Sequence, residues 1–231
     1  MVVKNIDLIV LEEEKISKIP LAAIYTADLP ERTYLINPQI YAQEPFNQYH
    51  HPNFLIHTYF NSLEDTKRLF QQILKDDLDM HKTYCQHLIE LPFAYATPEA
   101  YEKENAPTKS IAYYGGRDEG IIISLAQISE KMRDTAVHEF GHFMHEILSP
   151  GRYEKCDGVM KELMAIFVEE KADYQDTYEE QHPDHYKAQK LLHQLNEIYD
   201  YKTMDTAAQW NFLVGFMSHE NLDEYVTDTL R

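Results

Sequence analysis

The amino-acid sequence predicts an α+β protein, in which strands dominate the first part of the chain and helices the second. Short runs of high strand propensity, separated by prolines, occupy the first 60 residues, and apolar residues recur at helical spacing beyond residue 129. Strands and helices do not alternate regularly, which argues against repeating strand–helix units. We therefore expect a β-rich N-terminal segment, residues 1–60, packed on a main domain of residues 61–231.

The first 125 residues predict several short strands and one helix. Ser62 is the expected N-cap of this helix, because acidic residues follow in the first turn and an apolar stripe continues to Leu78. The run Gly-Ile-Ile-Ile-Ser-Leu at residues 120–125 is the most strand-like of the chain. The expected strands are residues 6–11, 21–25, 32–36, 88–95, 111–114 and 120–125.

The second half of the chain predicts helices alone. The first runs from about residue 129 to residue 148, where Ser149-Pro150-Gly151 breaks the pattern. A second is expected at residues 158–178. A third follows Pro183, with a core stripe of Ala188, Leu191, Leu192, Leu195, Ile198 and Tyr199. Asp205 or Thr206 is the expected N-cap of a fourth, which ends at Phe216, and residues 222–230 form a short last helix.

The charge and composition of the chain argue against several classes of protein. A formal net charge of −18 without a Lys/Arg cluster argues against binding to nucleic acid or to an anionic membrane. No run approaches the roughly 18–20 apolar residues of a membrane span, and the N-terminus lacks the pattern of a signal peptide, so we expect a cytoplasmic location. The two cysteines, Cys85 and Cys156, are expected to be reduced. Nothing in the sequence indicates the oligomeric state.

The pattern His-Glu-x-x-His at residues 138–142 predicts a zinc site. Residues four apart lie on one face of a helix, so His138 and His142 project toward one point. Zinc accepts imidazole nitrogen, and three protein ligands leave a position for water, from which Glu139 can take a proton. Gly141 costs about 1 kcal/mol against alanine in a helix, which requires a packing reason such as close approach of a neighbouring helix or the metal.

The third ligand is less directly indicated. An extended motif with a third histidine is excluded, because His145 and Leu148 stand where glycine and histidine would be needed. A cysteine ligand remains open in principle. Glu162 fits better, since the 20 residues after His142 allow one helix to end and a second to pack back across it. Glu169 is the reserve ligand.

These residues resemble the glutamate-zincins, the thermolysin-like clan of zinc peptidases. The similarity covers roughly residues 120–173, and Glu162, Ala165, Phe167 and Glu169 follow the pattern of that clan's glutamate helix. It implies a zincin-like domain with a small sheet, an active-site helix and a glutamate helix. It also implies one zinc ion on His138, His142 and Glu162. The sequence departs from thermolysin at Ile166, where thermolysin has an aspartate, and it lacks the amine-binding motif of the aminopeptidases, so no single family is indicated.

The predicted function is zinc-dependent hydrolysis of peptide bonds in a peptide or protein substrate, with Glu139 as the general base on a zinc-bound water. Two alternatives stay open. One is another zinc hydrolase of amidase or deformylase type, and the second is a non-catalytic binding protein with a vestigial metal site. A cysteine ligand would mark the deformylase type, whereas a closed fourth ligand, such as His145 or Glu169, would mark the vestigial site.

Four further expectations concern the surroundings of the metal. Glu169 is a candidate partner for a ligand histidine, and His145 is expected to be a partly buried structural residue. Residues 120–125 are a candidate edge strand that pairs with an extended substrate, or else an ordinary buried strand. Candidate donors to the oxyanion of the reaction are Tyr153, Tyr225 and His219.

Overall fold

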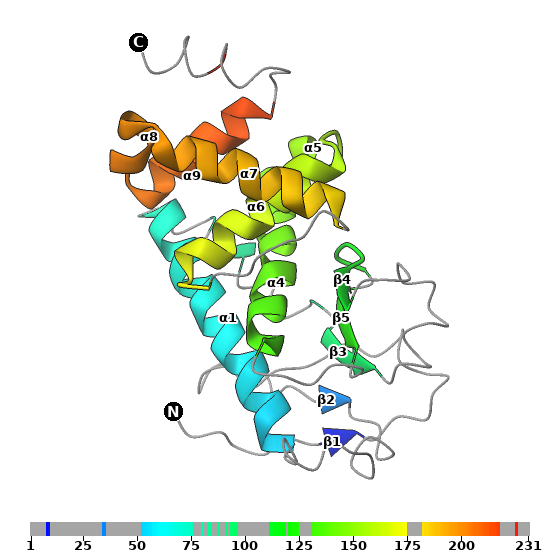
Figure 1. The fold of residues 1–231 in the computed structure, drawn as a ribbon. Helices are drawn as coiled ribbons and strands as arrows, with labels where there is room; N and C mark the ends of the chain where they lie inside the picture. Colours follow the sequence, from blue (N-terminus) through cyan, green and yellow to red (C-terminus); the bar gives the residue numbers. More distant parts are fainter. Residues whose placement is uncertain are drawn as a thin grey trace. The chain divides into compact units, whose positions relative to one another are not determined.

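The computed structural model shows a mostly helical protein with a small sheet (Figure 1). It describes residues 8–9, 34–35, 52–75, 80, 83–84, 87, 91, 93–96, 111–118, 120–124, 131–174, 182–217 and 225. The chain forms two compact units. One comprises Met1–Leu63 and Lys82–Glu139, and the second comprises Glu64–His81 and Phe140–Arg231.

The N-terminal part contributes two short strands and a long helix. Strands β1 (Leu8–Ile9) and β2 (Tyr34–Leu35) pair in parallel and fall within two of the expected runs. The expected strand at residues 21–25 lies outside the described residues. Because little of residues 1–51 is described, the boundary expected at residue 60 stays a prediction.

Helix α1 (Pro52–Leu74) starts ten residues before the predicted N-cap, so the prediction for Ser62 was wrong. The Ser62 hydroxyl donates to the carbonyl of Thr58 inside the helix. A serine can bond either forward at a cap or back to the preceding turn, and the sequence pattern does not separate the two. Proline at the first position of α1 is the actual start signal, since its missing N–H costs nothing there.

A three-stranded sheet has the order β3-β5-β4, with β3 at Phe93–Ala96, β4 at Ala112–Tyr114 and β5 at Ile121–Ser124. Strand β5 runs parallel to β3 and antiparallel to β4, and all four of its side chains are buried. The prediction of an edge strand at residues 120–125 is therefore wrong, because β5 is the middle strand. Its apolar residues are buried on both faces of the sheet, which confirms the alternative prediction of an ordinary buried strand.

Four of the predicted helices of the second half are present, although some of their ends differ from the prediction. Helix α4 (Met132–Leu148) ends where expected, and the short helix α5 (Pro150–Tyr153) follows the break at Ser149. Helix α6 (Gly158–Lys171) ends before residue 178, because Asp173 adopts a positive φ of 65° and turns the chain away.

Three further helices belong to the second compact unit: α7 (Pro183–Glu197), α8 (Tyr199–Thr203) and α9 (Thr206–Phe216). The carboxylate of Asp205 caps α9 by accepting a hydrogen bond from the Ala208 backbone N–H at 2.8 Å, as predicted. Helix α8 was not predicted. Of the last expected helix, residues 222–230, only Tyr225 is described.

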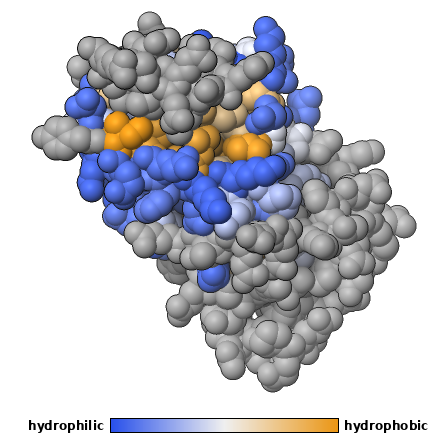
Figure 2. All heavy atoms as spheres, turned by 45° about the horizontal axis from the view of Figure 1, so that its top comes forward, coloured by the Kyte–Doolittle hydropathy of each residue, from blue (hydrophilic) through white to orange (hydrophobic). Residues whose placement is uncertain are grey.

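The core of this unit lies between these helices, and α7 packs along α6 (Figure 1). Its large buried side chains include Phe140, Phe143, Phe167, Trp210 and Tyr201. In the view of Figure 2, hydrophilic residues cover more of the described surface than apolar ones. None of the described helices combines the length and the apolar character that a membrane span requires.

Candidate metal centre

Helix α4 holds both histidines of the motif in its middle. His138 is 5% exposed and His142 is 9% exposed, and one helical turn separates them on the same face. Apolar neighbours on α4, including Ala136, Val137 and Phe140, are buried as well. The histidines are thus fixed by a well-packed helix rather than by a loop.

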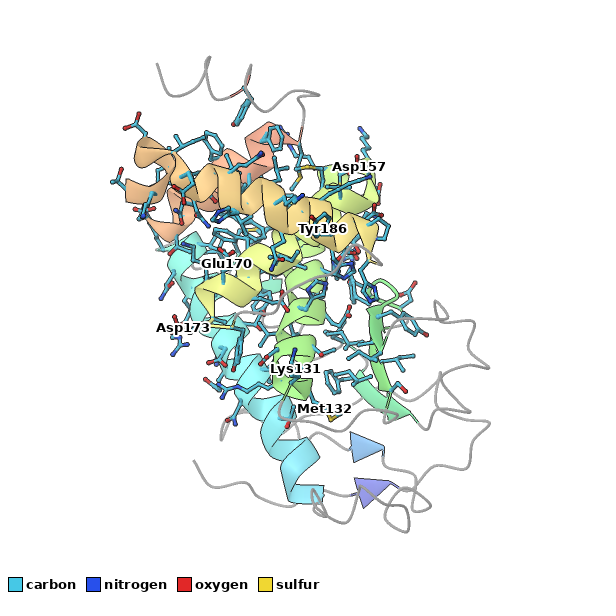
Figure 3. The ribbon with its side chains drawn as sticks, viewed as in Figure 1. Lys131, Met132, Asp157, Glu170, Asp173 and Tyr186 are labelled. Carbon is cyan, nitrogen blue, oxygen red and sulfur yellow. The ribbon has the colours of Figure 1, made fainter. Side chains whose placement is uncertain are left out.

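Glu162 comes from α6, which begins four residues before it at Gly158. The carboxylate of Asp157 caps this helix by accepting a hydrogen bond from the Met160 backbone N–H at 2.9 Å. Figure 3 shows Asp157 at this start of α6 and Glu170 near the opposite end. Residues 163–169 are all buried, so Glu162 lies where the exposed beginning of α6 enters the core.

Gly141 explains how α4 and α6 come close together. A Cβ atom at this position would lie 2.9 Å from the Cα atom of Ala165 and 3.2 Å from the Cβ atom of Val168. Backbone atoms cannot move aside as a flexible side chain can, so only glycine permits this crossing. The expected packing reason for Gly141 is confirmed, and it is the neighbouring helix.

His138, His142 and Glu162 form a group that can hold a metal ion. One donor atom from each residue lies within 4.8 Å of the others. His142 Nε2 and Glu162 Oε2 are 3.5 Å apart. Two ligands at about 2.0–2.1 Å from a tetrahedral zinc ion lie about 3.3–3.4 Å apart, so this pair needs to move little to bind one. Two imidazoles and one carboxylate are also a donor set that zinc accepts.

Glu162 has a further neighbour that the sequence analysis missed. Nε2 of His185, in the first turn of α7, lies 3.0 Å from Glu162 Oε2. The spacing of apolar residues on α7 could have indicated this neighbour. The buried stripe of Ala188 and Leu192 on α7 extends back by three residues to His185, which places this residue on the face toward α6.

Glu139 lies in the same turn of α4 as His138, and it is 6% exposed. Its carboxylate is therefore largely removed from solvent beside His138, a member of the group that can hold a metal ion. A buried carboxylate in this place is chemically suited to hold a proton during a reaction.

Glu169 and Cys156 are not members of the group in the part of the chain that the structure describes. Within the described residues the three-residue group uses Glu162, whereas Glu169 is buried further along α6. The Cys156 thiol donates to the carbonyl oxygen of Tyr153 at 3.3 Å, and burial raises the pKa of this thiol. Cys85 lies outside the described residues.

His145 is fully buried, so the expectation of a partly buried residue understated its burial. Its ring makes edge contacts with Tyr153 and Trp210, and neither ring nitrogen has a hydrogen-bond partner in the described part of the chain. Burial, with smaller contributions from the nearby charges of His142 and Lys161, lowers the pKa of His145 to about 3. The residue is thus neutral at physiological pH and adds no charge beside the histidine pair.

The candidate oxyanion donors have other contacts. The ring of Tyr153 packs against His145 and beneath the Lys161 ammonium, which lies 4.5 Å from the ring centroid. The Tyr225 hydroxyl donates to the Phe212 carbonyl at 3.0 Å, which gives it a structural role at α9. His219 lies outside the described residues.

Comparisons with known proteins give no match: no family model, no curated protein and no solved structure is similar to this chain. The interpretation of the site therefore depends on its own geometry and chemistry.

Proposed function

We propose that this protein is a zinc-dependent hydrolase of peptide bonds. The observation that carries the proposal is the group of two buried histidines, His138 and His142, with the half-buried Glu162. A buried carboxylate, that of Glu139, lies in the same helical turn as His138. Two histidines and one carboxylate favour zinc over magnesium or calcium, which prefer oxygen ligands.

The proposal includes a zincin-like main domain at residues 61–231, in which α4 is the active-site helix and α6 the glutamate helix. It also includes a peptide or protein substrate, and the cytoplasmic location remains a prediction from the sequence. The strongly acidic composition, with a net charge of −18, is unfavourable for polyanionic substrates.

His138, His142 and Glu162 would hold the zinc ion, which would supply a Lewis acid for the substrate carbonyl and lower the pKa of water. Glu139 then accepts the proton of the attacking water and passes it to the nitrogen of the leaving amine. A carboxylate suits this shuttle because it is ionised at neutral pH and can hold one proton between the two steps. His138 and His142 must stay neutral to offer their nitrogen lone pairs.

The ligand assignment is tested by metal content. Purified wild type is compared with His142→Ala and Glu162→Ala by elemental mass spectrometry after reconstitution with zinc. We expect about one zinc per chain in the wild type and a large loss in both variants, because each variant removes a ligand. Zinc retained in Glu162→Ala would move the third ligand elsewhere, and no zinc in the wild type would refute the proposal.

The catalytic assignment is tested with Glu139→Gln, which keeps the size of the side chain and removes the base. We expect full zinc content and cleavage of a quenched fluorescent peptide library reduced by about 10²–10⁴-fold. Glu146→Gln, on the same helix, is the matched control and should cleave as the wild type does. An active Glu139→Gln protein would disprove the role of Glu139.

The two alternatives predict different results. A deformylase-type site requires a cysteine ligand, so zinc binding that survives in a Cys85→Ala/Cys156→Ala double variant would exclude it. A vestigial site would bind zinc and leave the whole peptide library uncleaved. The contact of the Cys156 thiol with a backbone carbonyl argues against Cys156 as that ligand.

A further inference from the structure

The carboxylate of Glu162 is held from a third helix. Nε2 of His185 lies 3.0 Å from Glu162 Oε2, and the two side chains are 31% and 17% exposed, respectively. This distance falls within the range of a charge-assisted N–H···O bond, about 2.7–3.2 Å. Because a carboxylate only accepts, His185 must carry its proton on Nε2 and donate it.

The same geometry argues that His185 is not itself a ligand. A nitrogen that donates a proton to Glu162 has no lone pair left for a metal ion. The distance of 3.0 Å is also shorter than the roughly 3.3–3.4 Å between two ligands of a tetrahedral zinc ion, whereas the 3.5 Å between His142 and Glu162 is close to it. In the described part of the chain, the group of mutually close donor atoms contains His142 and Glu162 but not His185.

Helix packing fixes the place of this donor. His185 starts the stripe that continues through the buried residues Ala188, Leu192 and Leu195, and α7 packs along α6 through much of its length. The first turns of both helices meet closely, since a Cβ atom at Gly158 would lie 2.5 Å from the carboxylate of Asp184. His185 is therefore presented to Glu162 by a helix, not by a loop.

We propose that His185 is a positioning residue that orients the carboxylate of Glu162 for metal binding. The proposal rests on the ligand role given to Glu162 in the proposed function. A glutamate side chain has three rotatable bonds, and a hydrogen bond to one oxygen restricts them before the ion arrives. Removing such a partner of a ligand typically weakens metal binding by about 10–100-fold.

The test compares His185→Phe, which keeps a ring without a donor, with His185→Gln, which keeps a neutral donor. His193→Phe, at an exposed position of the same helix, is the control. Zinc affinity is measured by competition with a chromophoric chelator at neutral pH. We expect affinity about 10–100-fold weaker in His185→Phe, largely restored in His185→Gln and unchanged in His193→Phe.

The visible spectrum of the cobalt-substituted protein separates positioning from coordination. All variants should keep the band positions of the wild type, because the ligands are the same. A changed spectrum in His185→Phe, with a loss well beyond 100-fold and no rescue by glutamine, would make His185 a ligand and overturn the proposal. Circular dichroism of the metal-free variants verifies folding, and if His185→Phe fails to fold, His185→Leu, which also lacks a donor, takes its place beside His185→Gln.

Failure of this proposal is distinct from failure of the proposed function. A wild type that binds zinc and cleaves peptides, with unchanged affinity in His185→Phe, would refute only the role of His185. A wild type that binds no zinc would overturn both.

Discussion

Burial shifts the pKa values of two residues on α4 and α6, His145 and Glu170, in opposite directions. His145 is fully buried, and its pKa falls to about 3, so it is neutral beside His138 and His142, which must be neutral to bind a metal ion. Glu170, two turns beyond Glu162 on α6, shows the opposite direction. The pKa of Glu170 is raised, because the effect of burial exceeds the opposite effects of a hydrogen bond from Asn196 at 3.2 Å and of the charge of Lys171. Burial alone thus favours the neutral form of each group.

Glu170 gives a prediction of pH dependence. Its pKa is raised in the folded state, so its contribution to stability is fully present below the unfolded pKa and is lost as pH rises through the folded pKa. Glu170→Gln should therefore match the wild type near pH 4 and be more stable than it near pH 7. The measurement is the urea midpoint at both pH values. Glu154→Gln, at an exposed position, should show no such difference, and an equal effect of both substitutions would contradict the argument.

At the scale of elements, the site depends on how closely α4 and α6 cross and on where α6 begins. Gly141 permits the crossing because a Cβ atom there would lie 2.9 Å from the Ala165 Cα atom. Asp157 fixes the first turn of α6 through its bond to the Met160 backbone N–H. Neither residue belongs to the metal group, yet both determine where Glu162 lies.

Gly141→Ala should destabilise the protein by about 1–3 kcal/mol and weaken zinc binding, because the two helices must separate. Gly151→Ala is the matched control. A Cβ atom at Gly151 meets nothing within 4 Å, so alanine there should be neutral or stabilise by up to about 1 kcal/mol. Thermal unfolding and chelator competition measure the two effects. A Gly141→Ala protein as stable as the wild type would show that the crossing can relax.

Asp157→Ala should cost about 1 kcal/mol, because the Met160 backbone N–H loses its acceptor at the start of α6. Asp157→Asn keeps an acceptor and should retain most of the stability. Urea unfolding of both variants checks the prediction. Equal losses in the two would attribute the effect to the charge of Asp157 rather than to capping.

At the scale of the whole molecule, an ion held by residues of two helices must couple to folding. Unfolding separates Glu162 on α6 from the histidines of α4, so we expect zinc to bind the folded state more tightly than the unfolded state. Free zinc at 100 times its dissociation constant should stabilise the protein by about 2.7 kcal/mol.

Thermal unfolding with and without zinc tests this coupling. The melting temperature should rise with zinc in the wild type, return to its metal-free value after addition of a chelator, and stay constant in His142→Ala. The same rise in His142→Ala would show that the stabilising ion binds elsewhere.

Much of the helical half and the metal group could be predicted from the sequence, because both depend on short-range spacing. The interval of four residues places His138 and His142 on one face in any helix, and Asp205 carries its capping signal locally. Strand β5 shows a property that short-range spacing does not predict. An apolar run predicts a buried strand, but its central place in the sheet depends on partners at residues 93–96 and 112–114.

Two other features escaped prediction for related reasons. Ser62 lies inside α1 because its hydroxyl bonds back to Thr58, and a serine before acidic residues looks the same in either role. His185 reaches Glu162 only through the packing of α7 on α6, a contact between residues 23 positions apart. Propensity and periodicity describe a helix by itself and not its partner.

The close crossing at Gly141 has a consequence for mutational tolerance. Every other amino acid adds at least a Cβ atom, which would meet the backbone of Ala165 at 2.9 Å. A saturation library selected for zinc binding should therefore be as depleted of substitutions at Gly141 as at the ligand histidines, although glycine offers the ion no donor. Such a library would then identify Gly141 as essential because it lacks a side chain, and not because it binds the ion.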